Sequence, residues 1–472
     1  MKICMFVEGS YPYVQGGVSS WVHQLTTELS EHEITIISIM PSRNDISKVK
    51  YDLPKNIKSL RTIYLNDYLD NDPLKKSKEP KFNDLEREQI IKFFRFESDV
   101  MWDVVLKGLT NIKKTGDSVQ FFKSEFFWNA ILDYYNDEYS KEEFNLFFWT
   151  LRSMFIPLFN IIQSEMEDAD VFHTVSTGYA GILGLIAKFT YNKPLILTEH
   201  GIYAREREEE IIQAKWVTGI YKKFWIELFY YLSEAVYKNA DLVISLFDGN
   251  RQIQLELGSR EDNTIVVPNG VDLKKFNIEH LKTGDFNIGA ILRVVPIKDV
   301  KTLIRAFKLV KSNVEEAKLY IIGPTEEDEE YYNECLRLVD NMGISEDIVF
   351  TGKADVKKYM RIIDVLVLTS ISEGQPLVIL EGMASGVPFV STDVGGCREL
   401  LLGRENEPVG PSGIITTPVM PYETFEAIYT LYKESELREQ MSINGRKRVE
   451  TYYSKEQFIN KYRQIYDEIG RK

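Results

Sequence analysis

The chain has 472 residues, of which 44% are hydrophobic and 27% charged, so it can build ordinary globular cores and is not a disordered chain. At roughly 150 residues per domain, this length predicts two to three domains. The formal net charge is −14 and no strongly basic block occurs, which argues against nucleic acid as a partner. The three cysteines, Cys4, Cys335 and Cys397, are odd in number and far apart, so we expect no disulfide framework and a reducing cytosol.

The N-terminal residues indicate a first strand and not a signal peptide. The longest apolar stretch, at about 147–162, contains Arg152 and Pro157 and is shorter than the roughly 18 residues that span a bilayer. We therefore expect a soluble, intracellular protein of several domains.

The first half opens with the pattern of a doubly wound α/β unit. Apolar runs at 3–7 and 34–39 predict two strands, and apolar residues at helical spacing between 18 and 29 predict a helix between them. From about 42 to 165 this rhythm stops, and a segment rich in Lys, Asn, Asp and aromatics predicts a mostly helical insertion, with helices over 86–106 and 121–135. The α/β pattern then resumes and predicts a first domain over 1–280. Its elements are strands at 171–174, 194–198, 242–245 and 265–267 and helices around 180–189 and 215–239.

The second half alternates regularly between strands and helices, which predicts a parallel sheet with helices on both faces, over 281–452. Two such domains would face a central cleft at the carboxyl ends of their strands, where this architecture binds ligands. The segment 453–472, with a helix over 455–469, is expected to cross back to the first domain. The predicted strands are 288–292, 319–322, 348–350, 365–368 and 389–391, and the predicted helices are 300–311, 327–342, 356–363 and 377–384.

The most informative segment is 370–396, in which a polar loop after a predicted strand presents Glu373. Pro376 stands where the next helix begins, and Glu381 lies one turn inside that helix. Two acids at this spacing can accept hydrogen bonds from two polyol groups, such as two sugars. The alternative is a capping loop with a solvent-facing acid. Main-chain amides at this helix N-terminus form a candidate anion site, and they belong to Gln375, Leu377 and Val378.

Arg293 and Lys298 form a second candidate group. Arg293 directly follows a predicted strand and Lys298 precedes the next helix. Two cations at the carboxyl end of a strand can neutralise a diphosphate leaving group. A solvated surface pair is the alternative, and it becomes less favoured beside the Glu373 loop.

Two further candidates lie in the first half. Gly16 and Gly17 begin the first helix, and without side chains they let the backbone approach a ligand closely, although a tight turn would also explain them. His200 follows the strand 194–198 and could donate a hydrogen bond to a sugar hydroxyl or phosphate, although a lone histidine is usually structural. No G-x-G-x-x-G follows any strand, so a dinucleotide oxidoreductase is poorly supported.

The sequence predicts no metal site and no catalytic nucleophile. Asp70 with Asp72, and Asp168 with Asp170, match the pattern D-x-D, but the first pair lies in a polar turn and the second before a strand. The five histidines show no metal-ligand spacing, and neither a Cys/His pair nor a G-x-S-x-G elbow is present.

Together these residues resemble a known family. The string EGQPLVILE at 373–381, the Arg293 and Lys298 pair, PNGVD at 268–272, the two glycines and His200 are similar to the family-4 retaining glycosyltransferases of the GT-B fold. Within that family the chain resembles the Pel-polysaccharide (PelF-type) enzymes over nearly its whole length, insertion included. The two glutamates are shared by many sugar transferases, whereas the other strings are more diagnostic. The PelF-type strings are EGSYPYVQGGVSSWVHQL, TEHGIYARERE, SISEGQPLVILE and TDVGGCRELL.

This resemblance implies how the donor would be held. Arg293 and Lys298 would bind the diphosphate of a UDP-sugar, helped by the backbone at Gly16 and Gly17. Glu381 would hold the ribose hydroxyls. No metal and no further cofactor are expected. Many relatives have Gly-Arg and Lys-Gly at the two cation positions, and the loss of those glycines here could alter the loop around the diphosphate.

The resemblance also implies the catalytic roles. Glu373 would hold hydroxyls of the transferred sugar, and His200 would contact its 6-hydroxyl region or the developing charge. Transfer would retain the α configuration through front-face attack, with the departing phosphate oxygen deprotonating the acceptor, so no enzyme nucleophile is needed. Gln375 replaces the usual aromatic residue and could bias the choice of sugar. The amides near the transferred sugar would be those of Gln375, Leu377 and Val378.

We therefore expect a cytoplasmic hexosyltransferase that moves a sugar from UDP-hexose or UDP-N-acetylhexosamine to a growing exopolysaccharide. The alternatives are an enzyme of the same fold with a lipid or glucan acceptor, and a non-catalytic subunit that senses nucleotide sugars. Membrane-embedded synthesis and export subunits are candidate partners, with a peripheral position at the inner face of the cell membrane. The insertion's aromatics could form a surface for such partners, but helix core is the favoured interpretation.

Overall fold

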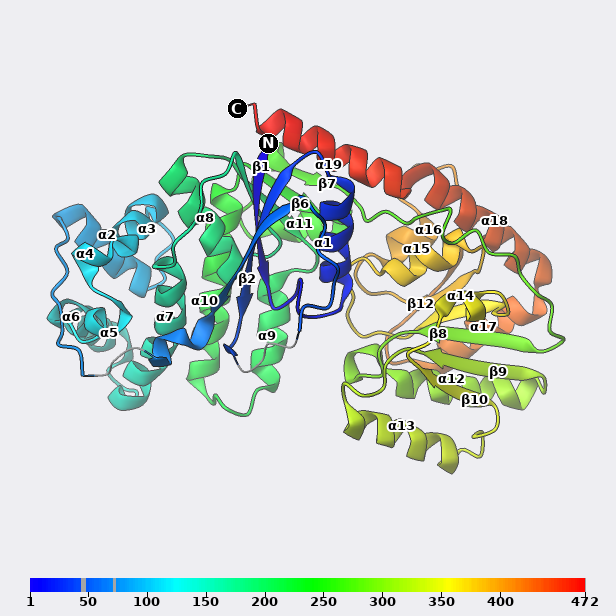
Figure 1. The fold of residues 1–472 in the computed structure, drawn as a ribbon. Helices are drawn as coiled ribbons and strands as arrows, with labels where there is room; N and C mark the ends of the chain where they lie inside the picture. Colours follow the sequence, from blue (N-terminus) through cyan, green and yellow to red (C-terminus); the bar gives the residue numbers. More distant parts are fainter. Residues whose placement is uncertain (44–47, 71–73, 472) are drawn as a thin grey trace. The chain divides into compact units, whose positions relative to one another are not determined.

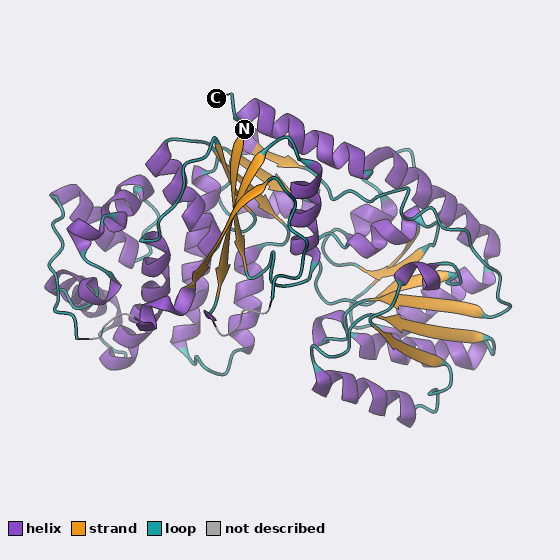
Figure 2. Cartoon of the chain, in the orientation of Figure 1, coloured by secondary structure: helices purple, strands orange, loops and turns teal. Residues whose placement is uncertain are grey.

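The structure is a computed structural model that describes residues 1–43, 48–70 and 74–471. It divides into two compact units. The N-terminal unit contains Met1–Val266 and Tyr462–Lys472, and the C-terminal unit contains Val267–Lys461. Each unit has one sheet flanked by helices, as Figure 2 shows. The prediction of two doubly wound α/β domains is therefore confirmed.

The sheet of the N-terminal unit is parallel throughout, in the order β3-β2-β1-β4-β5-β6-β7. The central strands are apolar runs that are buried almost completely, as expected for strands covered on both faces. Their carboxyl ends therefore meet at one edge of the sheet. The strands are β1 (Lys2–Glu8), β2 (Glu33–Met40), β3 (Ile57–Tyr64), β4 (Val171–Thr174), β5 (Leu195–Glu199), β6 (Leu242–Ser245) and β7 (Thr264–Val266).

Helices connect these strands on both faces of the sheet. In Figure 1, α1 lies on one side of the strands and α8 and α10 lie on the other. Two of the helices, α9 and α11, were not predicted, because each is short and polar and buries only a few residues. The helices are α1 (Gly17–Glu28), α8 (Tyr179–Tyr191), α9 (Tyr203–Gln213), α10 (Ile220–Asn239), α11 (Asp248–Glu256) and the 3-10 turn η4 (Glu261–Asn263).

Most of the predicted insertion is a separate helical layer. Its helices pack on the outer side of α8 and α10, away from the strands (Figure 1). The first part of the segment is not helical, however, because residues 57–64 form the edge strand β3. The predicted helix over 86–106 is broken at Phe96, which has a left-handed φ of 57°. The elements are η2 (Leu65–Asp70), α2 (Asp84–Phe94), α3 (Trp102–Thr110), α4 (Ile112–Thr115), α5 (Ser118–Phe121), α6 (Glu125–Tyr134), η3 (Tyr135–Tyr139) and α7 (Phe144–Ile162).

The aromatic residues of the insertion are mainly core, although Trp128 and Trp149 remain 46% and 57% exposed. The apolar stretch in α7 is longer than the sequence suggested, because the helix runs through Pro157 and begins three residues earlier. By length and composition alone α7 could cross a membrane, but half of it is buried inside the unit, as in a core helix. The buried aromatics include Phe121, Phe122, Phe126, Phe127 and Phe147.

The C-terminal unit has a six-stranded parallel sheet in the order β10-β9-β8-β11-β12-β13. The edge strand β13 was not predicted, because its sequence GIIT contains an apolar run of only two residues. The strands are β8 (Phe286–Ile291), β9 (Ala317–Ile322), β10 (Ile348–Gly352), β11 (Val365–Leu368), β12 (Phe389–Thr392) and β13 (Gly413–Thr416). The helices are η5 (Pro296–Lys298), α12 (Val300–Asn313), α13 (Glu329–Asn341), α14 (Val356–Met360), α15 (Leu377–Ala384), α16 (Cys397–Leu402), α17 (Pro421–Lys433) and α18 (Ser435–Tyr452).

The last helix, α19 (Lys455–Ile469), contributes to both units. Its first residue belongs to the C-terminal unit, where the amide of Lys455 donates to the carbonyl of Val271 at 3.0 Å. Its later residues belong to the N-terminal unit, where the Tyr466 hydroxyl is 2.6 Å from His173 Nδ1. Within the N-terminal unit this helix therefore packs on residues of the sheet itself.

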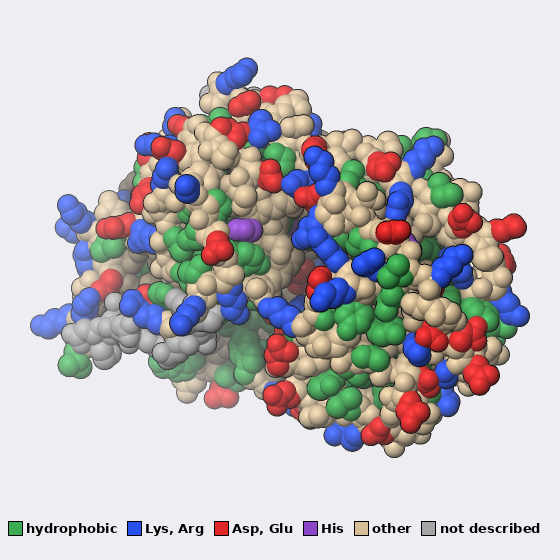
Figure 3. Space-filling view, turned by 45° about the vertical axis from the view of Figure 1, so that its right-hand side comes forward, with side chains coloured by type: hydrophobic (Ala, Val, Ile, Leu, Met, Phe, Trp, Pro, Cys, Tyr) green, Lys and Arg blue, Asp and Glu red, His purple; other side chains and the backbone are tan. Residues whose placement is uncertain are grey.

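Acidic and basic side chains are interspersed on the visible face of each unit (Figure 3). The single most buried charge lies inside the C-terminal unit. Arg448 is completely buried, its Nε is 2.7 Å from Glu407 Oε1, and its other nitrogens donate to the carbonyls of Leu401 in α16 and Val409 in the following loop. This guanidinium therefore joins α18 to the loop that precedes β13.

Replacing Arg448 with Met should lower the free energy of unfolding by about 3–5 kcal/mol, because Glu407 and several carbonyls would stay buried without their partner. Urea denaturation of the full chain measures this effect. The matched control is Arg398→Met, which breaks an exposed pair with Asp393 and should cost less than about 1 kcal/mol. Equal losses for the two variants would contradict this assignment.

Candidate functional site

The fold separates the predicted site residues into two groups. The N-terminal unit holds Gly16, Gly17 and His200. The C-terminal unit holds the other residues, which are Arg293, Lys298, Glu373, Gln375, Leu377, Val378 and Glu381. In each unit the residues lie near the carboxyl ends of parallel strands, the edge at which this architecture binds ligands.

Lys298 and Glu373 form an ion pair at this edge of the C-terminal sheet. Lys298 ends the turn η5 after β8, and Glu373 lies in the loop after the adjacent strand β11. The Lys298 Nζ is 2.5 Å from Glu373 Oε1, and the Ser370 hydroxyl donates to the same oxygen at 2.6 Å. Both charged side chains are largely buried, with exposures of 17% and 11%. The structure thus brings together a cation and an acid that are 75 residues apart in the sequence.

The two loops that carry this pair are bonded to each other through their backbones. The Thr369 hydroxyl donates to the carbonyls of Lys298 and Asp299, at 3.1 Å each. The amide of Ile371 donates to the carbonyl of Ile297 at 2.8 Å. These contacts fix the position of Lys298 against the Glu373 loop, independently of the ion pair.

Asp299 occupies the position where many members of the resembling family have glycine. Its φ of 43° and ψ of 52° are left-handed, a conformation that glycine adopts freely and that aspartate tolerates better than most residues. Its carboxylate accepts a hydrogen bond from the Thr302 amide and so caps α12. The loop shape that glycine would permit is therefore kept here by a capping aspartate.

The loop at 392–396 supports the Glu373 loop from the other side. Gly395 has a φ of 53°, and a Cβ at this position would lie 2.0 Å from the Glu373 carbonyl oxygen. The next amide, of Gly396, donates to the carbonyl of Gly374 at 2.8 Å. Glycine is therefore required at 395 by a close approach of two backbones, which explains part of the string TDVGG.

Arg293 is placed near the same edge but is not paired with Glu373. Its guanidinium forms an ion pair with Glu327, and both side chains are about half exposed. The structure therefore confirms the strand-end position of Arg293 and gives it a different acidic partner. Its assignment to a diphosphate stays a prediction.

Glu381 lies one turn inside α15, as predicted from its spacing. Burial raises its pKa to about 7, although the Lys275 ammonium partly opposes this shift. Near neutral pH the carboxyl group can therefore be protonated or ionised, and it can donate as well as accept a hydrogen bond. Pro376 is the N-cap of this helix and not its first residue, and its carbonyl accepts from the Ile379 amide at 3.2 Å.

The side chain of Gln375 is directed into the protein, contrary to the suggestion that it could influence sugar choice. It is buried, and its Oε1 accepts from the Asn269 amide at 2.7 Å. In return the Asn269 side-chain amide donates to the Gln375 carbonyl at 3.2 Å. This exchange explains why the string PNGVD accompanies EGQPL, because Asn269 of the first string holds the loop that contains the second.

Gly16 and Gly17 lie exposed at the start of α1, and Gly16 is its N-cap with an extended backbone. A Cβ at either position would meet no described atom within 4 Å. The packing of the described residues therefore does not require glycine here, and neither backbone conformation does. A role of these two glycines in ligand binding stays a prediction.

His200 follows β5 and packs against the edge of Trp21, with ring centroids 4.9 Å apart. Burial lowers the pKa of its imidazole to about 4, so the ring is neutral at physiological pH. Its Nε2 is buried and has no hydrogen-bond partner among the described residues. A neutral ring with an unused polar atom is suited to accept or donate one hydrogen bond to a ligand.

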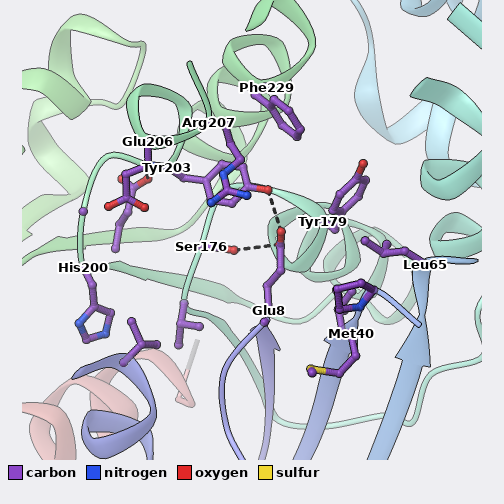
Figure 4. Close-up of a pocket in the computed structure, with 17 residues that line it drawn as sticks. Glu8, Met40, Leu65, Ser176, Tyr179, His200, Tyr203, Glu206, Arg207 and Phe229 are labelled. Atoms are coloured by element: carbon purple, nitrogen blue, oxygen red, sulfur yellow. Dashed lines mark hydrogen bonds between the residues drawn. The ribbon is translucent and has the colours of Figure 1, made fainter. Parts of the chain in front are cut away.

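His200 also lines a cavity of about 360 Å³ in the N-terminal unit (Figure 4). Glu8, the last residue of β1, lies between His200 and the apolar side chains of Met40 and Leu65 in this view. Its carboxylate accepts from the Tyr203 hydroxyl at 2.7 Å, from the Ser176 hydroxyl at 3.2 Å and from the Ala180 amide at 3.1 Å. Glu8 is thus held firmly at the cavity.

Three more polar groups at this cavity belong to the string TEHGIYARERE: Glu199 ends β5, and Glu206 and Arg207 lie on α9. Glu199 is fully buried, and burial raises its pKa although four donors surround it. Solvent reaches Glu206 from the cavity, but the packed protein around it and the nearby Glu199 raise its pKa to about 7. Gly201 leaves the space for this side chain, since a Cβ there would lie 2.0 Å from Glu206 Oε1.

The sequence analysis did not single out Glu8, Glu206 or Arg207 as functional, although all three lie inside strings quoted for the resemblance. A usable signal was present for Glu8, which is an acid at the carboxyl end of a strand, like Glu373 in its loop. Glu206 and Arg207 belong to α9, which was not predicted, so their direction toward the sheet edge could not be inferred.

Within the described residues no group of three or more His, Cys, Asp or Glu side chains is arranged to hold a metal ion. The carboxylate of Asp170 accepts from the Lys2 amide at 2.7 Å and acts as a local cap. The Asp70 side chain and Asp72 lie outside the described residues. The expectation that no metal is needed is not tested by these observations.

Comparison with known proteins identifies both halves of the chain. Residues 1–262 match the family described as domain of unknown function DUF3492, and residues 272–448 match glycosyl transferases group 1. The capsular polysaccharide biosynthesis glycosyltransferase CapM of Staphylococcus aureus is 25% identical over 322 residues, which is 63% of this chain and 79% of CapM. An Escherichia coli UDP-Gal:α-D-GlcNAc-diphosphoundecaprenol α-1,3-galactosyltransferase is 28% identical over 258 residues, 51% of this chain and 62% of the relative.

Among solved structures, Anabaena HepE in complex with UDP is similar to the chain, with a TM-score of 0.63 and 15% identity over 99% of this chain and 100% of HepE. This likeness confirms the GT-B fold that the sequence resemblance implied. Together with the group 1 match it also confirms a glycosyltransferase. The chain belongs to the DUF3492 family, and its second half is a group 1 glycosyltransferase domain.

Proposed function

We propose that this glycosyltransferase uses a UDP-sugar as donor and retains the anomeric configuration without a metal ion. The observation that carries the proposal is the buried Lys298–Glu373 ion pair, which lies at the carboxyl ends of β8 and β11, in the loop that leads into α15. HepE, which shares the fold, is described in complex with UDP. The site thus offers the cation, the acid and the helix N-terminus that a nucleotide sugar needs.

In this proposal the diphosphate binds Lys298 and Arg293. Each is paired with an acid in the protein, Glu373 and Glu327 respectively, so each is already positioned while its charge is balanced. A diphosphate would compete for the two cations, and charge-assisted hydrogen bonds to phosphate are among the stronger ones. The first amides of α15 and those at Gly16 and Gly17 would add partial positive charge.

Releasing Lys298 to the diphosphate also prepares Glu373 for the sugar. Once the ammonium moves toward phosphate, the Glu373 carboxylate regains an oxygen that can accept from hydroxyls of the transferred sugar. The Ser370 hydroxyl keeps the carboxylate oriented during this exchange. Glu381, with its raised pKa, would hold the ribose hydroxyls. Donor binding would therefore create the sugar site by changing the partner of one lysine.

The chemical step needs no enzyme nucleophile in this arrangement. The departing phosphate oxygen would take the proton of the acceptor hydroxyl on the same face of the sugar ring. Lys298 and Arg293 would neutralise the charge that develops on the phosphate, which is the main electrostatic demand of the reaction. Neutral His200 would donate a hydrogen bond to the transferred sugar.

The acceptor that we propose is a growing exopolysaccharide of the Pel type, at the cytoplasmic face of the membrane and beside membrane-embedded synthesis subunits. The name of CapM supports a polysaccharide product. A lipid-linked acceptor is the second candidate, because the name of the E. coli relative gives a diphosphoundecaprenol acceptor.

Replacing Glu381 or Lys298 with Ala should weaken UDP binding by roughly 10–100-fold, since each variant removes a hydrogen bond to a charged or ionisable group. Isothermal calorimetry of the full chain measures the dissociation constant. Glu373→Ala should bind UDP normally and lose transfer. The matched control Lys301→Ala removes an ammonium of α12 that pairs with Glu334 of α13, and it should leave UDP affinity unchanged. Undiminished UDP affinity in Glu381→Ala would remove the ribose assignment.

Transfer should persist in the presence of a chelator, because the two cations supply the charge that a metal would otherwise provide. The measurement is UDP release from a turnover assay with and without EDTA, and we expect rates within about twofold. Loss of activity with EDTA and recovery with magnesium would contradict a metal-independent mechanism.

The pH dependence of stability should report the neutral state of His200. Its pKa is about 4 in the folded chain and about 6.5 when unfolded, so only the unfolded chain gains this proton as the pH falls from 6.5 to 4. Stability is therefore lost over that window. The carboxyl groups of Glu206 and Glu381 have raised pKa values in the folded chain, so they increase its stability as the pH falls. The effect of His200 is therefore isolated by comparing the unmodified chain with His200→Gln.

His200→Gln should lose less free energy of unfolding between pH 7 and pH 5 than the unmodified chain does, as measured by urea denaturation at each pH. An imidazole signal of His200 that titrates near 6.5 in NMR would show that the ring is not held neutral.

A further inference from the structure

The cavity of the N-terminal unit contains only one residue of the proposed donor machinery, His200. Its other lining groups come from the ends of β1, β2 and β5, the segment after β4, the turn η2 and the helices α1, α8, α9 and α10. The volume of about 360 Å³ falls at the lower end of the roughly 300–1,000 Å³ of small-molecule sites. We therefore asked which chemical class of ligand this cavity fits.

Its anion-binding position is already filled by the protein. The N-terminus of a helix after a parallel strand commonly binds a phosphate through its free amides. Here the N-cap of α8 is Gly178, which has no side chain, and the Ala180 amide in the first turn donates to Glu8 instead. Glu8 is further fixed by two hydroxyl donors, those of Ser176 and Tyr203. A phosphate or carboxylate on the ligand would have to displace this carboxylate.

The remaining charges also disfavour an anion. Three carboxyl groups line the cavity, those of Glu8, Glu199 and Glu206, against one cation, Arg207. The guanidinium of Arg207 is paired with Glu210 and lies over the Tyr203 ring, 5.3 Å from its centroid. An acidic ligand would therefore meet like charge in a confined space, where such repulsion is stronger than in water.

The other lining groups suit a sugar ring. Tyr179, Tyr203 and Phe229 provide aromatic surface, with Phe229 packed against both tyrosines at centroid distances of 6.4 and 5.8 Å. Aromatic rings pack on the apolar face of a sugar, while carboxylates accept from its hydroxyls. One further buried nitrogen, Arg207 Nε, has no hydrogen-bond partner among the described residues and could serve the acceptor, whereas His200 Nε2 is assigned to the transferred sugar.

We propose that this cavity binds the end of the acceptor as a sugar without an acidic group, and that Glu8 and Glu206 reject a sugar that carries a carboxylate or phosphate. The inference rests on the proposed sugar transfer and adds to it the class of acceptor. A neutral sugar and an amino sugar both fit the cavity, because each can donate hydrogen bonds to the two carboxylates and neither is negatively charged.

The first experiment compares three matched oligosaccharides as acceptors at pH 8, where Glu206 is ionised. These are an N-acetylhexosamine oligomer, the deacetylated form of the same oligomer and a hexuronate oligomer of equal length. Calorimetry in the presence of UDP should show binding of the first two, and at least tenfold weaker binding of the hexuronate. Equal or tighter binding of the hexuronate would overturn the proposal.

The second experiment uses variants of the two acids. Glu206→Gln should reduce the discrimination against the hexuronate by roughly tenfold, and Glu8→Gln should do the same. The control is Glu209→Gln, an exposed acid of α9 that does not line the cavity and should keep full discrimination. Unchanged discrimination in Glu206→Gln would refute the proposal, even if Glu8→Gln fails to fold through loss of its bonds to α8.

UDP affinity separates this inference from the proposed function. Unmodified protein and variants should bind UDP equally, since no UDP-binding residue is changed. Normal UDP binding without acceptor discrimination would refute the acceptor class alone. Absence of UDP binding in the unmodified chain would refute the proposed function and the inference with it.

Discussion

The buried ion pair between Lys298 and Glu373 is the interaction on which the C-terminal site depends. A buried ion pair is stable only when opposite charges and further hydrogen bonds compensate the loss of water; here Glu373 pairs with Lys298, and the Ser370 hydroxyl donates to Glu373. The pair connects loops that follow two adjacent strands, and bonds from the Thr369 hydroxyl and the Ile371 amide to carbonyls of the other loop hold the loops together without it. Because the loops are fixed independently, Lys298 can change partners without unfolding the site. Under the proposed function, such a pair would hold two ligand-binding groups with their charges compensated until the donor binds.

Much of the fold could be predicted from the sequence, because the signals are local. Apolar runs of three to six residues, separated by helices, predicted most strands of both sheets, and Pro376 marked the beginning of α15. The elements that were missed are β3, β13 and the helices α9, α11, α16, α17 and α18. Strand β3 is only partly buried and lies at a sheet edge, β13 has only two apolar residues, and α9 is so highly charged that its few buried positions give no clear periodicity.

The candidate residues could be predicted only as far as their positions in the chain allowed. Strand-end positions identified Arg293, Lys298 and His200, since parallel strands bring their ends to one edge of the sheet. Their partners depend on long-range pairing, and so the bonds of Gln375 with Asn269 and of Arg293 with Glu327 could not be inferred. Backbone conformation was equally hidden: nothing in the sequence shows that Asp299 takes over the left-handed position of a glycine. Glu8 was overlooked because a carboxylate that caps a helix from a different strand leaves no spacing pattern.

The two units use the same structural feature in opposite ways. In both, a helix follows a parallel strand and presents its first amides at the edge where ligands bind. In the C-terminal unit the N-cap of α15 is Pro376, which provides no side-chain cap, so the amides of the first turn are not bonded to a capping side chain. In the N-terminal unit the first turn of α8 is occupied by Glu8, an anion that belongs to the protein. A nucleotide diphosphate is therefore compatible with one edge and excluded from the other. Because a sugar transferase must bind a highly charged donor and a separate acceptor, a helix end filled by a fixed carboxylate would, under the proposed function, direct the donor to the C-terminal unit and leave the cavity of the N-terminal unit to the acceptor.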